Sequence, residues 1–422
     1  MLNRLVSRGR NAPLNPPGEH HPGLPQDQTS CTGFVTSPTS PSWDAEGLLM
    51  YFANAVLPRF QLIEEALPLD LEAIMEDHTL QQAIMAVSRA HYDTFSHATS
   101  SKSLLSRRRA RHITIHMLRQ RLELGPDAAT TAEHLFPVNV LLCMLDGMIE
   151  PTEQSNASVC HLKGGYALLI HENSNIQATM LARGGLPAHL LSIFATMDLV
   201  HALLGGEKPY FDPFIWHMFS ETQAWFGRLD NDDRFLELLK TFSEMAILGY
   251  TVRSKLPSHD GLRLVQRCLS SIESMLSKQA QSQISPTSNP GITSTQWRRF
   301  CALYELAAQL YMYRALRMLA IDDDIVQTAT RQGVELLVER PLPGMLAHCT
   351  IFPILIIGAH ATYAQDRRAI LEAITPSKDY LSFGNLQVMT ELLRDHWARS
   401  GPNTQLDWWQ CFRSFAGHVF LF

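Results

Sequence analysis

Two acidic clusters are the strongest candidates for catalytic chemistry in this sequence. They lie at residues 322–324 (Asp-Asp-Asp) and 231–233 (Asn-Asp-Asp). Carboxylates of this kind can hold magnesium against a diphosphate, as in the all-helical class I terpene cyclases. In those enzymes an aspartate cluster comes first and an Asn/Ser/Glu motif follows. Here the Asn-Asp-Asp cluster precedes the aspartate triplet, and Phe235 stands where the Asn/Ser/Glu motif needs a hydroxyl group. We therefore interpret both clusters as helix N-caps and loop charges, because carboxylates favour helix starts.

Cysteine and histidine spacing gives no motif for a metal site or a nucleophile. The closest pair of cysteines is seventeen residues apart, which excludes the Cys-x-x-Cys zinc spacing. Neither a Gly-x-Ser-x-Gly elbow nor a His-Glu-x-x-His helix occurs. A catalytic Cys/His pair whose members are distant in sequence but close in the folded chain stays open as an alternative. The sequence predicts no catalytic, cofactor-binding or metal-ligating residue, no cofactor, and a protein that is not an enzyme. The cysteines are Cys31, Cys143, Cys160, Cys268, Cys301, Cys349 and Cys411.

A basic run at residues 106–122 is the main concentration of positive charge. It contains Arg107, Arg108, Arg109 and Arg111. The run fits either a solvated helix face or a patch for nuclear import or phosphate contact. The net charge of −6 argues against a broad surface for nucleic acid. The buried side of this helix is predicted to carry Ala110, Ile113, His116 and Met117.

The helix predicted around residues 156–171 is the element about which the chain is organised. It contains the adjacent glycines Gly164 and Gly165, each of which weakens an isolated helix by about 1 kcal/mol. No strand precedes them and no Gly-Lys-Ser/Thr follows, so a phosphate-binding loop is not supported. We expect both glycines to face another helix at close range, where replacement by leucine would overpack the contact.

The remaining periodicity predicts an all-α fold of many antiparallel helices in one large domain, residues 43–422. Order is expected to begin near Ser42 or Asp44, and His91 is interpreted as a core or groove histidine. Residues 1–42 hold seven prolines among serine, threonine and glycine, so we predict a disordered segment there. Residues 279–293 are predicted to form a polar linker. Helices are predicted at about 48–58, 71–95, 135–148, 186–204, 234–250, 261–278, 295–318, 324–339, 344–363, 366–375, 385–399 and 406–415.

Six short stretches, in order, carry a resemblance to a known family. The sequence resembles the fungal-specific transcription factor domain, the large helical region that follows six-cysteine binuclear zinc clusters in fungal regulators. The resemblance covers nearly all of the chain after residue 43. The stretches are residues 51–60 (YFANAVLPRF), 81–92 (QQAIMAVSRAHY), 161–170 (HLKGGYALLI), 304–316 (YELAAQLYMYRAL), 352–359 (FPILIIGA, then Arg367 and Arg368) and 393–397 (LRDHW).

The resemblance implies a nuclear transcriptional regulator whose helical domain serves regulation, dimerisation and small-molecule sensing. A secondary-metabolite gene cluster is the expected target. One departure concerns the zinc cluster, because Cys31 is the only cysteine in the first 142 residues. We therefore expect a protein that acts without its own zinc-cluster DNA-binding module, or a truncated version of a longer product.

The expected partners follow from that departure. They are a DNA-binding regulator or a second copy of the chain, with DNA reached indirectly and a small-molecule effector as a further ligand. No membrane association is expected, since the most apolar run, residues 351–359, is too short to span a bilayer. A helical scaffold protein and an all-α biosynthetic enzyme are the alternatives.

Overall fold

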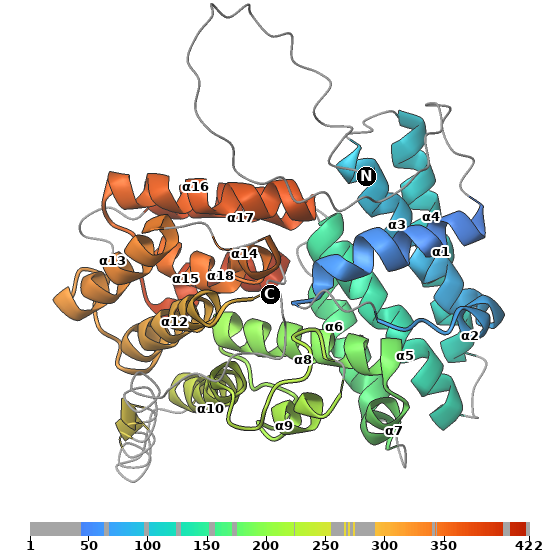
Figure 1. The fold of residues 1–422 in the computed structure, drawn as a ribbon, viewed down its shortest axis with the longest axis horizontal. Coiled ribbons are helices and arrows are strands. Elements are labelled where there is room, and N and C mark those ends of the chain that lie inside the picture. The colour runs from blue at the N-terminus through green and yellow to red at the C-terminus, as the bar shows by residue number, and fades with distance from the viewer. Residues whose placement is uncertain are drawn as a thin grey trace, which may run out of the picture. The chain divides into compact units, whose positions relative to one another are not determined.

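Helices account for the regular secondary structure of the computed structural model, and no strand occurs in the described residues (Figure 1). This confirms the predicted all-α fold. The residues described are 44–62, 67–96, 101–123, 128–151, 157–170, 175–222, 224–254, 266, 269–270, 273–274, 292–339, 342, 344–399 and 406–418. The predicted disordered segment 1–42, most of the predicted helix 261–278 and nearly all of the predicted linker 279–293 lie outside them. Trp43–Phe422 form one compact unit, and the proposed domain division stays a prediction.

The first helices begin at aspartates that cap them. α1 (Ala45–Tyr51) starts after Asp44, whose Oδ1 accepts a hydrogen bond from the Gly47 amide at 2.8 Å. The chain continues through a π turn (Phe52–Val56) and a 3-10 turn (Leu57–Phe60).

The prediction of a single helix over residues 71–95 is wrong, because the structure has two helices there. They are α2 (Leu71–Glu76) and α3 (His78–Phe95). Asp77 stands between them in extended backbone, and its carboxylate accepts from the amides of Thr79 and Leu80. An aspartate that caps the next helix competes with continuation of the previous one.

Two long apolar helices form the centre of the domain. α5 (Ala128–Met144) runs on into a π turn (Leu145–Ile149). α8 (Gly185–Gly205) packs against α5, α10 (Arg234–Ser254) and α18 (Trp408–His418). The segments Ala132–Ile149 and Gly185–Gly205 are long and apolar enough to cross a membrane, judged by length and composition alone. In each, 89% of the residues are buried inside the domain, the pattern of a core helix surrounded by others. Two shorter helices nearby, α7 (Ile176–Arg183) and α9 (Ile215–Ser220), were missed by periodicity.

The C-terminal half continues as helices, of which residues 234–254 are drawn in yellow-green and those from residue 294 onward in orange and red in Figure 1. The predicted helix 344–363 is divided by a turn at Cys349 and Thr350. Pro353 explains the break, because a proline is accommodated in a first turn but clashes with the preceding turn of a continuing helix. The elements are α10 (Arg234–Ser254), α12 (Ser294–Tyr311, then a π turn Met312–Leu316), α13 (Asp324–Glu339), α14 (Gly344–His348), α15 (Ile351–Ala359), α16 (Ala364–Leu381), α17 (Gly384–Arg399) and α18 (Trp408–His418).

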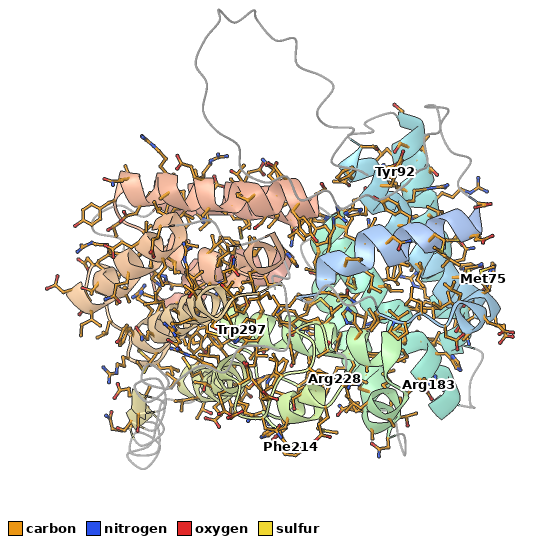
Figure 2. All side chains as sticks on the ribbon, viewed as in Figure 1. Met75, Tyr92, Arg183, Phe214, Arg228 and Trp297 are labelled. Carbon is orange, nitrogen blue, oxygen red and sulfur yellow. The ribbon has the colours of Figure 1, made fainter. Side chains whose placement is uncertain are left out.

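An aromatic cluster joins α10 to α12 in the core. The Phe235 ring lies 5.8 Å from Trp297, 5.1 Å from Phe300 and 5.0 Å from Tyr304, measured between ring centroids. Trp297 is only 1% exposed, and Figure 2 shows it among the side chains packed around α12. Such edge-to-face contacts add to the stabilisation from buried area.

The two adjacent glycines lie on α6 (Ala157–Leu169), which packs against α5 and α8. A Cβ atom on Gly165 would lie 2.6 Å from Phe194 Cε2 on α8 and 2.7 Å from Asn139 Nδ2 on α5. On Gly164 it would lie 3.2 Å from Asn139 Oδ1. The expected close approach is confirmed, and Gly165 is the tighter of the two positions.

His91 is a core histidine, as predicted. The ring is fully buried; its Nδ1 lies 2.9 Å from the Tyr51 hydroxyl and its Nε2 lies 3.0 Å from the Leu381 carbonyl oxygen. Burial lowers the pKa of His91 to about 4. A neutral ring that donates from Nε2 to Leu381 accepts from Tyr51 at Nδ1, and so links α1, α3 and α16.

Candidate functional site

The basic run lies on α4 (Ser101–Glu123), and three of its six arginines, Arg107, Arg111 and Arg121, form ion pairs within the domain. The Arg107 guanidinium lies 3.6 Å from the Asp93 carboxylate and 3.4 Å from that of Glu150. Arg111 pairs with Asp146, which is almost fully buried. These two arginines therefore serve the fold, and their charges are locally neutralised.

The predicted buried side of α4 is right for Ala110 and Met117, which are half-buried, and wrong for Ile113 and His116. Thr114 and Leu118 point inward, whereas Ile113 is 39% exposed and His116 is exposed too. The inward stripe also carries Arg107 and Arg111 at helical spacing, because its neighbours offer carboxylates rather than an apolar surface. Periodicity of apolar residues cannot identify a helix face that is held by ion pairs.

The opposite side of α4, here called the outer face, is exposed and combines positive charge with apolar side chains. Leu105 is 66% exposed and Leu122 is 52% exposed. Arg108 and Arg109 project between them without an ion pair to another described residue. The outer face comprises Leu105, Arg108, Arg109, His112, Ile113, His116, Arg119 and Leu122. This composition fits an acidic partner segment that also carries apolar residues.

The acidic clusters lie at helix starts, as the sequence predicted. Asp233 Oδ1 accepts from the Phe235 amide at 2.8 Å where α10 begins, and Asp323 Oδ1 accepts from the Ile325 amide at 3.0 Å where α13 begins. Burial raises the pKa of Asp233 to about 6. In the part of the chain that the structure describes, no three His, Cys, Asp or Glu side chains are grouped so that they could hold a metal ion.

The four buried cysteines are poor candidates for a nucleophile. Cys143, Cys301, Cys349 and Cys411 are buried free thiols, and burial raises the pKa of each. A raised pKa keeps a thiol protonated, whereas a reactive cysteine needs a stabilised thiolate. Cys160 is exposed.

A cavity of about 480 Å³, here called the α18 cavity, opens between α6, α8, α10 and α18 beside the loop at residues 206–214. Leu162 and Ala202 form part of an apolar floor, and Tyr250 and Trp409 contribute aromatic walls. This volume and mixed lining are typical of small-molecule sites.

Positive side chains from four elements line the α18 cavity. They are Lys163 on α6, Lys208 in the loop, Arg253 on α10 and Arg413 on α18. The Arg253 guanidinium donates to the Gly205 carbonyl, lies 5.9 Å from the centroid of the Trp409 ring, and lies 3.8 Å from the Glu207 carboxylate. Among the described residues, Lys163, Lys208 and Arg413 form no ion pair.

Asp198 on α8 holds the loop over the α18 cavity. Its Oδ2 accepts from the Tyr210 amide at 2.7 Å and from the Phe211 amide at 3.4 Å. Burial raises the pKa of Asp198 to about 7, although these two hydrogen bonds favour the charged form. The Tyr210 ring stacks on Tyr166 of α6 with 3.7 Å between centroids, which fixes the other side of the loop.

Sequence reasoning found the basic run but missed the α18 cavity. The lining residues run from Val159 to Gly417, and no local motif connects them. One signal was present, because Asp198 is the only acidic residue in the mostly apolar helix α8. A buried carboxyl group needs hydrogen-bond partners, and those partners mark the loop that borders the cavity.

The described residues thus define an all-helical domain with an exposed basic helix face and a cation-lined cavity, a class suited to binding. The family model described as fungal specific transcription factor domain matches residues 47–422. The chain belongs to this family, as the resemblance implied. No curated protein and no solved structure gives a significant match.

Proposed function

We propose that this protein is a nuclear regulator of transcription that acts through a protein partner and reaches DNA indirectly. The family match over residues 47–422 is the observation that carries the proposal. Residues 43–422 act as one regulatory domain, and the genes regulated form a limited set, such as a secondary-metabolite cluster. The protein is not an enzyme; the raised thiol pKa values and the capping role of the acidic clusters support this.

The outer face of α4 is the surface that we assign to the partner, a DNA-binding regulator or a second copy of the chain. Arg108 and Arg109 project from it, whereas Arg107 and Arg111 are occupied within the domain. The net charge of −6 disfavours tight direct binding to duplex DNA, since that affinity depends on phosphate neutralisation. Exposed apolar side chains between the arginines favour a protein partner over a phosphate backbone.

Transcript profiling of a deletion strain tests the proposal. We expect a limited set of transcripts to change, and a fluorescent fusion to accumulate in the nucleus. An unchanged transcriptome would overturn the regulatory function and favour the scaffold or enzyme alternatives.

Charge reversal tests the outer face. The double variant Arg108→Glu/Arg109→Glu should stay folded and nuclear but reproduce the deletion profile, because an acidic partner would be repelled. Arg331→Glu/Arg394→Glu changes the charge equally at exposed positions on α13 and α17, and should complement the deletion. If the α4 variant leaves the nucleus and a fused import signal restores regulation, the outer face serves import and the docking assignment is wrong.

A further inference from the structure

We propose that the α18 cavity binds a small organic anion, a carboxylate or a phosphate monoester attached to an apolar or aromatic body. Nothing in the family match assigns this site. Anion binding in this cavity does not depend on the proposed regulatory function. If the anion is an effector, its effect on transcription rests on that function.

The shape of the α18 cavity sets the size of the ligand. A volume of about 480 Å³ lies within the range of roughly 300–1,000 Å³ that is usual for metabolite-sized ligands. The Tyr250 and Trp409 side chains and the floor at Leu162 offer contacts for an apolar body. A bare inorganic ion would leave most of this lining uncovered.

The charge of the lining sets the sign of the ligand. Lys163, Lys208 and Arg413 come from three separate elements, and none of them has an ion-pair partner among the described residues. Like charges gathered around one space repel one another, and an anion placed between them removes that repulsion.

The two carboxyl groups at the cavity do not cancel these charges. Glu207 lies near Arg253, the fourth cation, at 3.8 Å. Asp198 directs its Oδ2 to the amides of Tyr210 and Phe211, so it is engaged with the loop. The charge that is left without a partner at the cavity is therefore positive. It lies on long lysine and arginine side chains whose ends can close around an anionic group.

The position of the cavity gives binding a mechanical consequence. Arg413 and Trp409 belong to α18, whereas Lys163 belongs to α6. α18 is already held to α8 by the hydrogen bond from Trp408 Nε1 to the Leu203 carbonyl at 2.8 Å and by the contact of His201 Nδ1 with the Ala416 carbonyl at 3.2 Å. An anion bound by Arg413 and Lys163 would add a bridge between α18 and α6. Local unfolding of α18 would then be less frequent, because it would have to break this bridge.

Matched charged and neutral probes test the proposal on the purified full chain. The pairs are benzoate with benzamide, indole-3-acetate with indole-3-acetamide, and phenyl phosphate with phenol, and inorganic phosphate is the control for a bare ion. We expect at least one anion to raise the melting temperature by about 3 °C or more, and its neutral match to have no effect. Stabilisation by a carboxylate but no phosphate, or the reverse, identifies the anionic group.

Variants localise the binding. Lys163→Ala/Arg413→Ala should weaken binding of the effective anion at least tenfold in calorimetry, whereas Arg331→Ala/Arg394→Ala should bind as the parent does. Lys208→Glu provides a second test at an exposed loop position should the double variant unfold. Hydrogen exchange should slow in α18 when the anion is bound. The proposal is overturned if no probe anion binds, if the neutral partners bind equally, or if the cavity variants retain full affinity.

Discussion

At the scale of single residues, Asp198 shows how burial changes chemistry that its sequence context does not reveal. The side chain is 2% exposed, and its pKa is raised to about 7. Periodicity placed residue 198 correctly within a core helix, but it gave no partner for the carboxyl group. The partners, Tyr210 and Phe211, lie in a loop whose path depends on tertiary packing. The candidate site could therefore not be predicted from local pattern, because its polar groups are paired only in the folded chain.

The raised pKa of Asp198 predicts a pH-dependent stability. Between pH 4 and pH 7 the folded protein keeps a proton that the unfolded chain releases, so this carboxyl group stabilises the fold at low pH and loses that effect as the pH rises to 7. Asp198→Asn keeps an acceptor oxygen but cannot ionise. The free energy of unfolding of the parent, relative to the variant, should fall by roughly 1.4 kcal/mol for each pKa unit of the shift.

Urea denaturation of both proteins at pH 4.5, 6.0 and 7.5 measures this difference. The exposed carboxylate variant Asp395→Asn controls for the loss of one surface charge. A difference between parent and Asp198→Asn that stays constant across the three pH values would contradict the assignment of the proton to Asp198.

At the scale of elements, prediction succeeded where apolar spacing decides a helix and failed where polar contacts decide it. The helix predicted at 324–339 has the bounds of α13 (Asp324–Glu339). The helix predicted at 71–95 is divided at Asp77. The inward face of α4 differs from the predicted one, because Arg107 and Arg111 face inward to carboxylates. In each failure a charged side chain selects a partner that is distant in sequence or competes with the helical backbone.

The glycine pair on α6 gives a prediction at this scale. Gly165→Ala should destabilise the protein by about 1–3 kcal/mol, because the added Cβ would lie 2.6 Å from the Phe194 ring and the contact would be overpacked. Gly164→Ala is the matched control. Its Cβ would lie 3.2 Å from Asn139 Oδ1, the end of a side chain, and the gain of about 1 kcal/mol in helix propensity offsets the crowding.

Thermal melting of the two alanine variants distinguishes these contacts. Gly165→Ala should melt below the parent, and Gly164→Ala should melt near it. Equal melting temperatures for the two variants would show that the approach of α8 to α6 does not determine stability, and that only their shared helical propensity matters.

At the scale of the whole molecule, helical periodicity and the absence of strand patterns were enough for the fold class. The arrangement of the helices was not predictable, since it rests on contacts such as that of Phe235 with Trp297 between α10 and α12. The same limit applies to charge. Composition gives a net charge of −6, but only the folded chain shows that Arg107 and Arg111 are neutralised while Arg108 and Arg109 project.

This distribution of charge predicts how the isolated protein behaves toward DNA. Binding to duplex DNA should be weak, independent of sequence and sensitive to salt. If Arg108 and Arg109 supply the phosphate contacts, the slope of log affinity against log salt should be about −2, since each neutralised phosphate contributes roughly −0.9. Fluorescence anisotropy with two unrelated duplexes, at several salt concentrations, measures the slope and the selectivity.

Removal of the charges of Arg108 and Arg109 tests whether these two side chains supply the phosphate contacts. Arg108→Ala/Arg109→Ala should abolish most of the salt dependence, whereas Arg331→Ala/Arg394→Ala should leave it unchanged, because those arginines lie on α13 and α17. Tight binding to one duplex at physiological salt would require base contacts by this chain itself. The protein would then need no DNA-binding partner, and the indirect route to promoters would be wrong. Weak binding that is equal for both duplexes, together with an altered transcriptome in the deletion strain, leaves a partner as the component that selects the sequence.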